Sequence, residues 1–242
     1  MKAVILCAGK GTRISSFFNG PKCLIPINGT PLLVHNIRLL EKCSVTEAII
    51  VSSQGMLPLL KQTVEQYGTT IPVRHAVQRI RLGTAHGLSK AEPFLGREPF
   101  FYLVGDNFTG FALSLLMKAR RKEDADAVIA LKAVADPSRF GSAEVRGRTV
   151  LRLAEKSSRP PSNLSFTSMA VFRPSIFDAI RATPKNPRAG EYFLTDSINV
   201  LIAGGGKVIY VPVTTWRLNI NTPQEYETAE RFARRLKKTG KR

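Results

Sequence analysis

The chain has 242 residues, 43% of them hydrophobic, so it is long enough to bury one large core or two small ones. This composition excludes a disordered chain and a peptide-sized scaffold. Lysine and arginine total 36 against 18 acidic residues, a net charge of +18. Such a surface attracts polyanions, so nucleic acid, acidic lipid and polyphosphorylated small molecules are all candidate partners.

The cysteines and the amino terminus indicate where the protein works. Cys7, Cys23 and Cys43 are an odd set without a C-x-x-C pair, which argues against a disulfide framework and against a zinc site. The apolar run Ala3–Ala8 is too short for a signal peptide, and no later stretch approaches membrane-spanning length. We therefore expect a soluble, cytoplasmic protein with no membrane partner.

Short β-rich blocks alternate with helical patterns along the first half of the chain. This alternation predicts an α/β domain around a mainly parallel sheet. The first helix is predicted to begin with Thr30 as N-cap and Pro31 at the first helical position. Strands are expected at Ala3–Leu6, Ala48–Val51, Phe100–Val104 and Ala127–Leu131, and further helices at Met56–Tyr67, Thr84–Ala91 and Ala112–Arg121.

The pattern changes between about residues 137 and 175, where turns rather than helices join the strands, so we expect a small antiparallel insertion. Its strands are predicted at Ala143–Val145, Val150–Leu153 and Phe166–Phe172, followed by a helix at Thr195–Ala203, a strand at Lys207–Val211 and a closing helix from Pro223. One domain is expected over residues 1–230, with a basic helix end or tail over 231–242 that holds seven cations and no acidic residue.

Three segments carry candidate chemistry. In the first, the strand Ala3–Leu6 runs into Ala8-Gly9-Lys10-Gly11-Thr12-Arg13 and then Pro21-Lys22. Glycines let backbone N–H groups turn toward an anion and the cations neutralise it, so this loop suits a phosphate chain. It is neither the dinucleotide fingerprint nor the P-loop, and a tight turn is an equally good reading.

The second segment is the loop Gln78–Ala85, which leads into a helix. Gln78 can offer a paired donor and acceptor to a base edge, and Gly83 would let a flat ring lie close to the backbone. The alternative is that Gln78 caps a strand and Thr84 caps the helix.

The third segment, Leu103–Asn107, places Asp106 at the end of a buried strand, where ligands gather in open α/β sheets. A carboxylate beside a triphosphate invites Mg²⁺, although a lone Asp after a strand is also a common turn or N-cap residue.

Taken together and in this order, these motifs resemble the sugar-1-phosphate nucleotidyltransferases. The resemblance continues over essentially the whole chain, through Arg139-Phe140-Gly141, Glu155-Lys156, Gly190-Glu191-Tyr192, Leu194-Thr195-Asp196 and Asn219 before Thr222-Pro223. It implies a Rossmann-like, three-layer α/β/α fold with a mainly parallel mixed sheet and the antiparallel insertion on the sugar side. It also implies a reaction in which an NTP and a sugar 1-phosphate give an NDP-sugar and pyrophosphate with Mg²⁺ as cofactor.

The resemblance also implies a role for each matched residue. Arg13 would hold the departing pyrophosphate, Lys22 the α-phosphate, and Asp106 and Asn219 the metal. The nucleotide-binding residues would be Ala8, Gly9, Gly11, Thr12, Gln78, Gly83 and Thr84. The sugar phosphate would be bound by Gly141, Glu155, Lys156 and Thr195.

Asn219 and Phe193 stand where the thymidylyl- and glucose-1-phosphate uridylyl-type members have Asp and Glu, and both resemble the N-acetylglucosamine-1-phosphate uridylyltransferase branch. Ser168-Met169-Ala170 replaces the usual Gly-x-Tyr, which leaves the sugar open. UTP or dTTP is the expected nucleotide.

Two other classes of protein remain open. A nucleic-acid-binding protein would explain the basic surface, but aromatic residues are scarce among the basic clusters, so stacking platforms are not evident. The second class is a catalytically degenerate member of the resembled family with a binding role, and the retained Arg13, Lys22 and Asp106 argue against it. The three histidines, His35, His75 and His86, are predicted to be structural.

Overall fold

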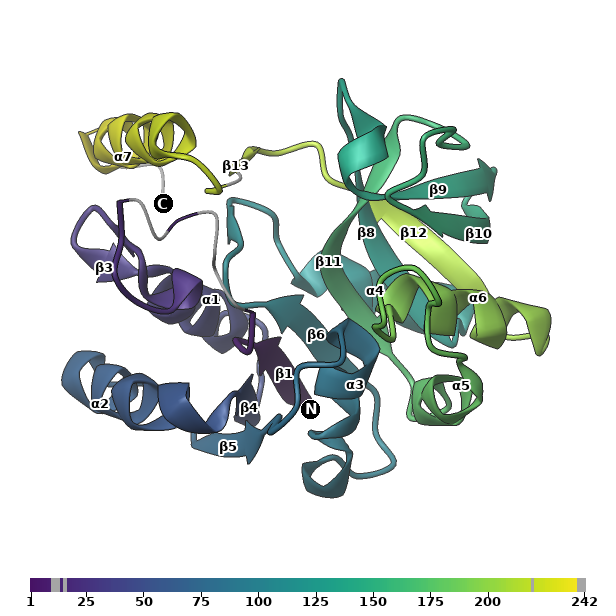
Figure 1. Ribbon diagram of the computed structural model, residues 1–242, viewed down its shortest axis with the longest axis horizontal. Coiled ribbons are helices and arrows are strands. Elements are labelled where there is room, and N and C mark those ends of the chain that lie inside the picture. The colour runs from purple at the N-terminus through teal and green to yellow at the C-terminus, as the bar shows by residue number, and fades with distance from the viewer. Residues whose placement is uncertain (10–13, 15–16, 219, 239–242) are drawn as a thin grey trace.

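A nine-stranded mixed sheet organises the fold, and helices cover both of its faces (Figure 1). The computed structural model of the chain describes residues 1–9, 14, 17–218 and 220–238. In spatial order the strands are β5 (Val73–Val77), β4 (Glu47–Ser52), β1 (Lys2–Leu6), β6 (Phe100–Val104), β11 (Leu164–Phe172), β8 (Ala127–Ala133), β12 (Val208–Pro212), β10 (Thr149–Glu155) and β9 (Gly141–Arg146). Neighbours from β5 to β6 are parallel, as are β8 and β12, whereas β11, β10 and β9 pair antiparallel with their neighbours.

The fold has three layers, with helices on both sides of the sheet. Two hydrophobic clusters, one on each face of the sheet, hold these layers together. One packs against α1 (Leu32–Glu41), α2 (Leu57–Tyr67) and α4 (Ser114–Glu123), and the other against α3 (Thr84–Ser89), α5 (Ile176–Ala182) and α6 (Leu194–Ala203). Successive strand residues point to opposite faces, so Ala3 and Ile5 enter the first cluster and Val4 enters the second. The predicted three-layer α/β fold with a mixed sheet is confirmed.

The antiparallel strands belong to the main sheet. β9 and β10 form its far edge, in keeping with the predicted insertion, but β11 lies in its middle between β6 and β8. Seven of the nine residues of β11 are buried, and both faces of such a strand need covering layers. The assignment of Phe166–Phe172 to the small antiparallel insertion is therefore corrected, because this segment is a central strand of the main sheet.

The start of the first helix also differs from its prediction. Thr30 and Pro31 form a short strand, β3, paired with β2 (Pro26–Ile27), and α1 begins only at Leu32. Asn28 and Gly29 connect the two strands with φ of 51° and 74°. An Asn-Gly pair with two positive φ angles is a strong signal for a hairpin, and it outweighs the Thr-Pro capping signal.

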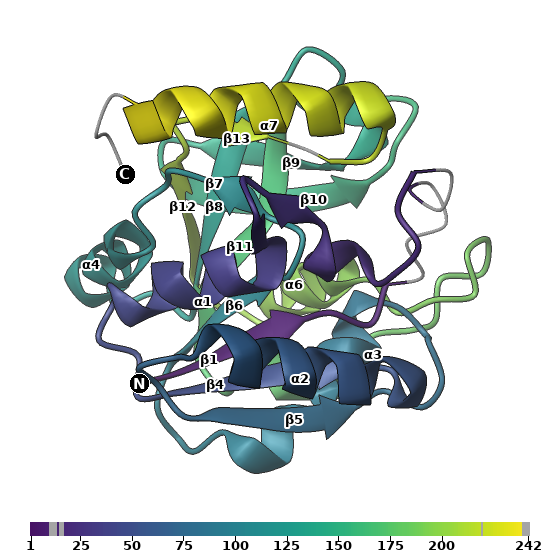
Figure 2. The same ribbon diagram turned by 90° about the vertical axis from the view of Figure 1, so that its left-hand side faces the viewer.

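The last helix, α7 (Pro223–Lys238), packs across one end of the molecule beside α1 and the β2–β3 hairpin (Figure 2). It contributes Ala229 and Ala233 to a third hydrophobic cluster, and the ring of Phe232 lies 5.0 Å from that of Trp216. α7 therefore continues without a break across residue 230, where the sequence predicts the basic end to begin.

Candidate active site

The candidate site lies at the carboxyl ends of the neighbouring parallel strands β1 and β6. Leu6 and Val104 are paired there, and the chain continues from them into Ala8-Gly9 and into Gly105-Asp106. The next two strands of the main sheet along the chain, β4 and β5, lie on one side of β1, whereas β6 lies on the other. Ligands bind at such reversals of strand order in open α/β sheets. A Cβ at Gly9 would meet no atom within 4 Å, so a ligand could approach its backbone closely.

Gly105 is required by close packing beneath the site. A Cβ there would lie 2.5 Å from Cys7 Sγ and 3.0 Å from the Cβ of Cys23. Both cysteines are buried free thiols. The hydrogen bond with Cys23, and then burial, raise the pKa of the Cys7 thiol, so it stays protonated and serves as a small packing group.

Lys22 and Asp106 meet at the centre of the site. Lys22 begins a short helical turn, Lys22–Leu24, and its Nζ donates to Asp106 Oδ2 at 2.5 Å and to Asn221 Oδ1 at 2.8 Å. Three segments far apart in the sequence thus converge on one ammonium group. Sequence reasoning predicted Lys22 and Asp106 but missed Asn221.

The beginning of α7 positions Asn221. Thr222 Oγ1 accepts the N–H of Glu225, and the Glu225 carboxylate accepts the N–H of Asn221 at 2.6 Å. The Thr222-Pro223-Gln224-Glu225 order matches a helix N-terminus signature, in which both side chains satisfy backbone donors. Asn221 is therefore held by the same helix start that the sequence marks.

Two cations hold Asp106 in its ionised form. Burial is the largest effect on its pKa and acts to raise it, but Lys22 and then Arg217 outweigh burial, so the net pKa lies below its usual range. Arg217 belongs to a short strand, β13 (Arg217–Leu218), which pairs with β7 (Phe108–Thr109), and β7 begins two residues after Asp106.

A buried polar network supports the Gly105–Asn107 turn. Asn36 Nδ2 lies 3.2 Å from Gly105 O and 3.0 Å from Asn107 O, and Arg217 Nε donates to Asn107 Oδ1 at 3.0 Å. Sequence reasoning missed Asn36 and Arg217. Asn36 shares a helix face with Leu33, Ile37 and Leu40, and a polar residue on an apolar face is the signal that could have found it. No comparable signal marks Arg217.

Gln78 directs its side chain toward the protein. It follows β5, is 3% exposed, and its Nε2 lies 3.1 Å from Gly83 O and 2.9 Å from His86 Nδ1. The amide thereby closes the 79–83 loop onto α3. The ring of His86 contacts Gln78, and the structural role expected for this histidine stays a prediction.

Gly83 and Thr84 join this loop to the Tyr192–Leu194 segment. Gly83 has φ +97°, and a Cβ there would lie 2.5 Å from Tyr192 O and 2.8 Å from Tyr192 N. Tyr192 N donates to Leu82 O at 2.7 Å, and Thr84 Oγ1 accepts the N–H of Leu194 at 3.0 Å. The absent side chain of Gly83 is thus explained by a neighbouring backbone. Thr84 does not cap α3, and its hydroxyl instead accepts the first N–H of α6.

The four residues predicted to bind a sugar phosphate lie close together. Thr195 Oγ1 donates to Glu155 Oε2 at 3.0 Å, and Lys156 Nζ lies 3.7 Å from Glu155 Oε1. A Cβ at Gly141 would lie 2.7 Å from Thr195 Cγ2 and 3.0 Å from Glu155 Oε2, so only glycine fits beside this pair. Strands β9 and β10 and helix α6 each supply part of this cluster.

With this geometry in place, comparison with known proteins identifies the family. The chain matches the nucleotidyl transferase family over residues 2–234. This protein belongs to that family. The enzyme class implied by the sequence resemblance, a nucleotidyltransferase, is thereby confirmed.

Individual relatives agree with the family match. This nucleotidyltransferase is 30% identical over 234 residues to the UTP--glucose-1-phosphate uridylyltransferase AglF of Haloferax volcanii, covering 95% of each chain. It is 29% identical to a glucose-1-phosphate thymidylyltransferase of Streptomyces griseus, covering 86% of this chain and 59% of the relative. A UDP-glucose pyrophosphorylase structure in complex with UDP-glucose superimposes with a TM-score of 0.85 at 19% identity, covering 97% of this chain and 98% of that one, which shows a shared fold.

Several predicted site residues lie outside the described residues, namely Gly11, Thr12, Arg13 and Asn219. Their roles stay predictions. Within the described part of the nucleotidyltransferase, no group of three or more His, Cys, Asp or Glu side chains could hold a metal ion. The oxygens around Lys22 Nζ nevertheless have the chemistry of a cation site, because a carboxylate and an amide oxygen already converge there on a positive charge.

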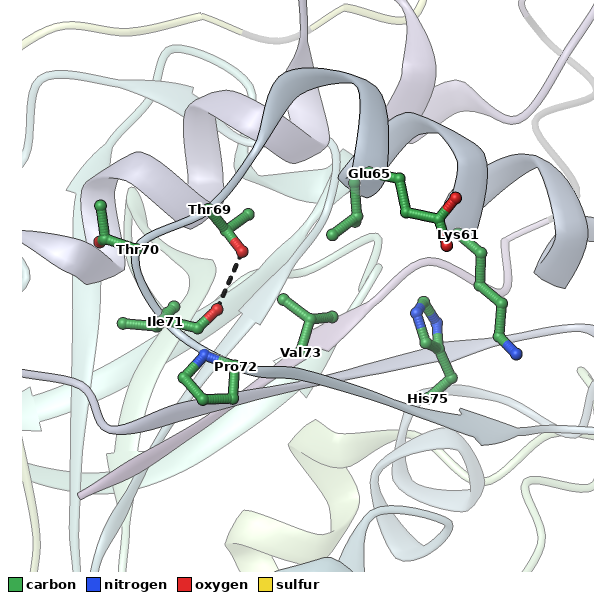
Figure 3. A pocket seen from close by; sticks show the side chains of 9 residues that line it. Lys61, Glu65, Thr69, Thr70, Ile71, Pro72, Val73 and His75 are labelled. Carbon is green, nitrogen blue, oxygen red and sulfur yellow. Dashed lines mark hydrogen bonds between the residues drawn. The ribbon is translucent and has the colours of Figure 1, made fainter.

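A hollow lies away from these residues. A cavity of about 540 Å³ opens between α2 and β5, where Lys61 and Glu65 face His75 across the space (Figure 3). None of its lining residues belongs to the candidate site of the nucleotidyltransferase. Across the described residues, no helix has the length and apolar character needed to cross a membrane.

Proposed function

We propose that this nucleotidyltransferase transfers a nucleotidyl group from UTP or dTTP to a sugar 1-phosphate, releasing pyrophosphate and an NDP-sugar. The observation that carries the proposal is that the residues matched to the two substrates form two clusters, each with one lysine and one carboxylate. Lys22 and Asp106 meet at the carboxyl ends of β1 and β6, and Lys156, Glu155 and Thr195 gather where β10 and α6 meet. The uridylyl- and thymidylyltransferase relatives support both the reaction and the pair of candidate nucleotides.

The chemistry asks for cations rather than for a nucleophilic side chain. A phosphate oxygen of the sugar is already anionic, so it can attack the α-phosphorus of the NTP without a general base. The P–O bond to the β-phosphate breaks, and its electron pair leaves with pyrophosphate. The barrier lies in bringing two polyanions together and in the charge on the leaving group, which fixed cations reduce. Lys22 would bind the α-phosphate, and Lys156 the phosphate of the sugar.

Mg²⁺ fits the oxygen atoms that surround Lys22. Asp106 Oδ2 and Asn221 Oδ1 would hold it, with Asn219 as the further ligand that the family resemblance implies. When bound, the ion would neutralise phosphate charge and keep several waters. Asp106 is already compensated by Lys22, so a divalent cation must displace that ammonium. We therefore expect Lys22 to move from Asp106 to the nucleotide when NTP and Mg²⁺ bind together.

We also place the reaction in the cytoplasm. Cys7, Cys23 and Cys43 are all free thiols, as expected in a reducing compartment.

A pyrophosphate-release screen tests the proposed function. UTP, dTTP, GTP, CTP and ATP are each combined with glucose, N-acetylglucosamine and mannose 1-phosphates in the presence of Mg²⁺. Turnover with UTP or dTTP, and formation of the matching NDP-sugar by mass spectrometry, is the expected result. Absence of turnover with every pair, together with tight salt-sensitive RNA retention on a filter, would instead favour the nucleic-acid-binding hypothesis.

A further inference from the structure

Lys156 sits on an unusual piece of backbone at the end of β10. Its φ is +42°, in the left-handed region that non-glycine residues rarely adopt, and its N–H donates to Phe140 O at 3.0 Å. The backbone is therefore pinned in a conformation that side chains disfavour. Such positions are kept where the direction of the side chain matters.

The side chain of Lys156 is 58% exposed, yet two groups lie near its ammonium. Glu155 Oε1 is 3.7 Å away, which is long for a charge-assisted hydrogen bond. The other Glu155 oxygen, Oε2, accepts the Thr195 hydroxyl. The second group is the ring of Phe193, whose centroid lies 5.7 Å from Lys156 Nζ.

Phe193 lies at the edge of the hydrophobic core rather than within it. It is only partly buried, whereas the next two residues, Leu194 and Thr195, are 2% and 4% exposed. It directly precedes α6, and the N–H of Leu194 is held by Thr84 Oγ1. The backbone that carries the ring is thus tied to the start of α3.

We propose that Phe193 is a positioning residue that holds the Lys156 ammonium ready for the phosphate of the sugar 1-phosphate. This inference rests on the proposed function. An aromatic face attracts an ammonium group through its quadrupole but does not neutralise its charge. The ring therefore limits the arrangements of a long, exposed side chain and leaves the full positive charge for the phosphate. A carboxylate in the same place would pair with Lys156 and compete with the substrate.

Steady-state kinetics of Phe193→Leu tests the role of the ring, with the most active NTP and sugar 1-phosphate pair. The KM for the sugar 1-phosphate should rise about two- to five-fold, the range that a cation–π contact at an exposed site supports. The KM for the NTP should stay unchanged, because the proposed function assigns the α-phosphate of the NTP to Lys22 and not to Lys156. Phe193→Tyr keeps an aromatic face and should restore the wild-type KM.

The contact itself can be measured without turnover. After reductive ¹³C-methylation of the lysines, the Lys156 signal, assigned by its loss in Lys156→Arg, should show a ring-current shift in the wild type. Phe193→Leu should remove that shift, and Phe193→Tyr should keep it.

The outcomes separate the two proposals. An unchanged KM for the sugar 1-phosphate in Phe193→Leu, or an equal rise in both KM values, would overturn the positioning role while the proposed function stands. Wild-type protein without turnover on any substrate pair would overturn the proposed function and this role with it, even if the Lys156 signal still reported the ring.

Discussion

The two lysines of the site are held in opposite ways. The Lys22 side chain is 20% exposed and lies 2.5 Å from a carboxylate oxygen, whereas that of Lys156 is 58% exposed and lies 3.7 Å from one. A charge removed from water must be paired and hydrogen-bonded, while an exposed one needs no such partner. The charge of Lys22 is therefore already paired in this structure, whereas Lys156 keeps its charge available to a ligand. Under the proposed function, Lys22 would exchange Asp106 for a phosphate, and Lys156 would not need to exchange a close partner.

The largest effect is expected from Asp106→Asn, which removes the one described carboxylate in contact with Lys22 Nζ. It should abolish turnover at millimolar Mg²⁺, because an amide lacks the charge that a cation site in this position requires. Pyrophosphate release over a Mg²⁺ titration measures this. Full activity in the variant would mean that other residues hold the metal.

Calorimetry of the free protein with Mg²⁺ also tests whether Asp106 is part of a metal site. Because Lys22 already compensates Asp106, weak Mg²⁺ binding without nucleotide is expected and stronger binding with it. Micromolar affinity in the absence of nucleotide would contradict this.

The next largest effect is expected from Lys22→Met, which removes a charged contact to the transition state. kcat/KM should fall by a factor of about 10² to 10³. Among the described residues, the variant leaves Arg217 as the remaining cation that lowers the pKa of Asp106, so the melting temperature of the variant should fall as well. Adding Asp106→Asn should recover stability without recovering activity. Lys61→Met, at the separate cavity of Figure 3, is the matched control and should change neither property.

Gly83→Ala should break the connection between the 79–83 loop and the Tyr192–Leu194 segment. A Cβ there would overlap the Tyr192 backbone at 2.5 Å, and the φ of +97° strains any side chain. Displacing both segments should lower kcat/KM by about 10-fold or more and raise the KM for both substrates. Gly96→Ala, where a Cβ meets nothing within 4 Å, is the control. An effect on one substrate alone would show that the two segments are not coupled.

Truncation after Glu230 tests whether the basic end is a detachable tail. It removes buried Ala233 and the Phe232 ring packed on Trp216, so the melting temperature should fall by about 5 °C or more. The double variant Arg231→Gln/Lys237→Gln removes two charges from exposed positions and should leave both stability and turnover unchanged. It should weaken any salt-sensitive RNA retention. Equal melting temperatures for the truncated and intact proteins would contradict the packing role of α7.

The smallest effect concerns acid stability. The pKa of Asp106 is lower in the native protein than in the unfolded chain, so its ionised form stabilises the fold above the unfolded pKa of about 4. That contribution is lost as the pH falls through the native pKa. Urea unfolding of wild type and Asp106→Asn between pH 6 and 3 should show a stability difference that shrinks toward the acid end. A difference independent of pH would remove Asp106 from this role.

Local sequence signals determined much of this molecule. Strands with long apolar runs, such as Phe100–Val104, and the helix start at Thr222-Pro223 are set by burial periodicity and capping, which act within a few residues. The ordered motifs placed Lys22, Asp106, Glu155 and Thr195 in one family pattern, and the family is confirmed.

Tertiary structure decided what local signals do not encode. The central place of β11, the contact of Asn221 with Lys22, and the effect of the Arg217 charge on Asp106 all join segments far apart in the chain. Long-range pairing depends on which surfaces meet when the whole sheet closes, and no residue pattern within one segment records it. For the same reason, the sequence predicted that Gly83 would let a flat ring lie close to its backbone, but only the folded chain showed that the backbone of Tyr192 occupies that space.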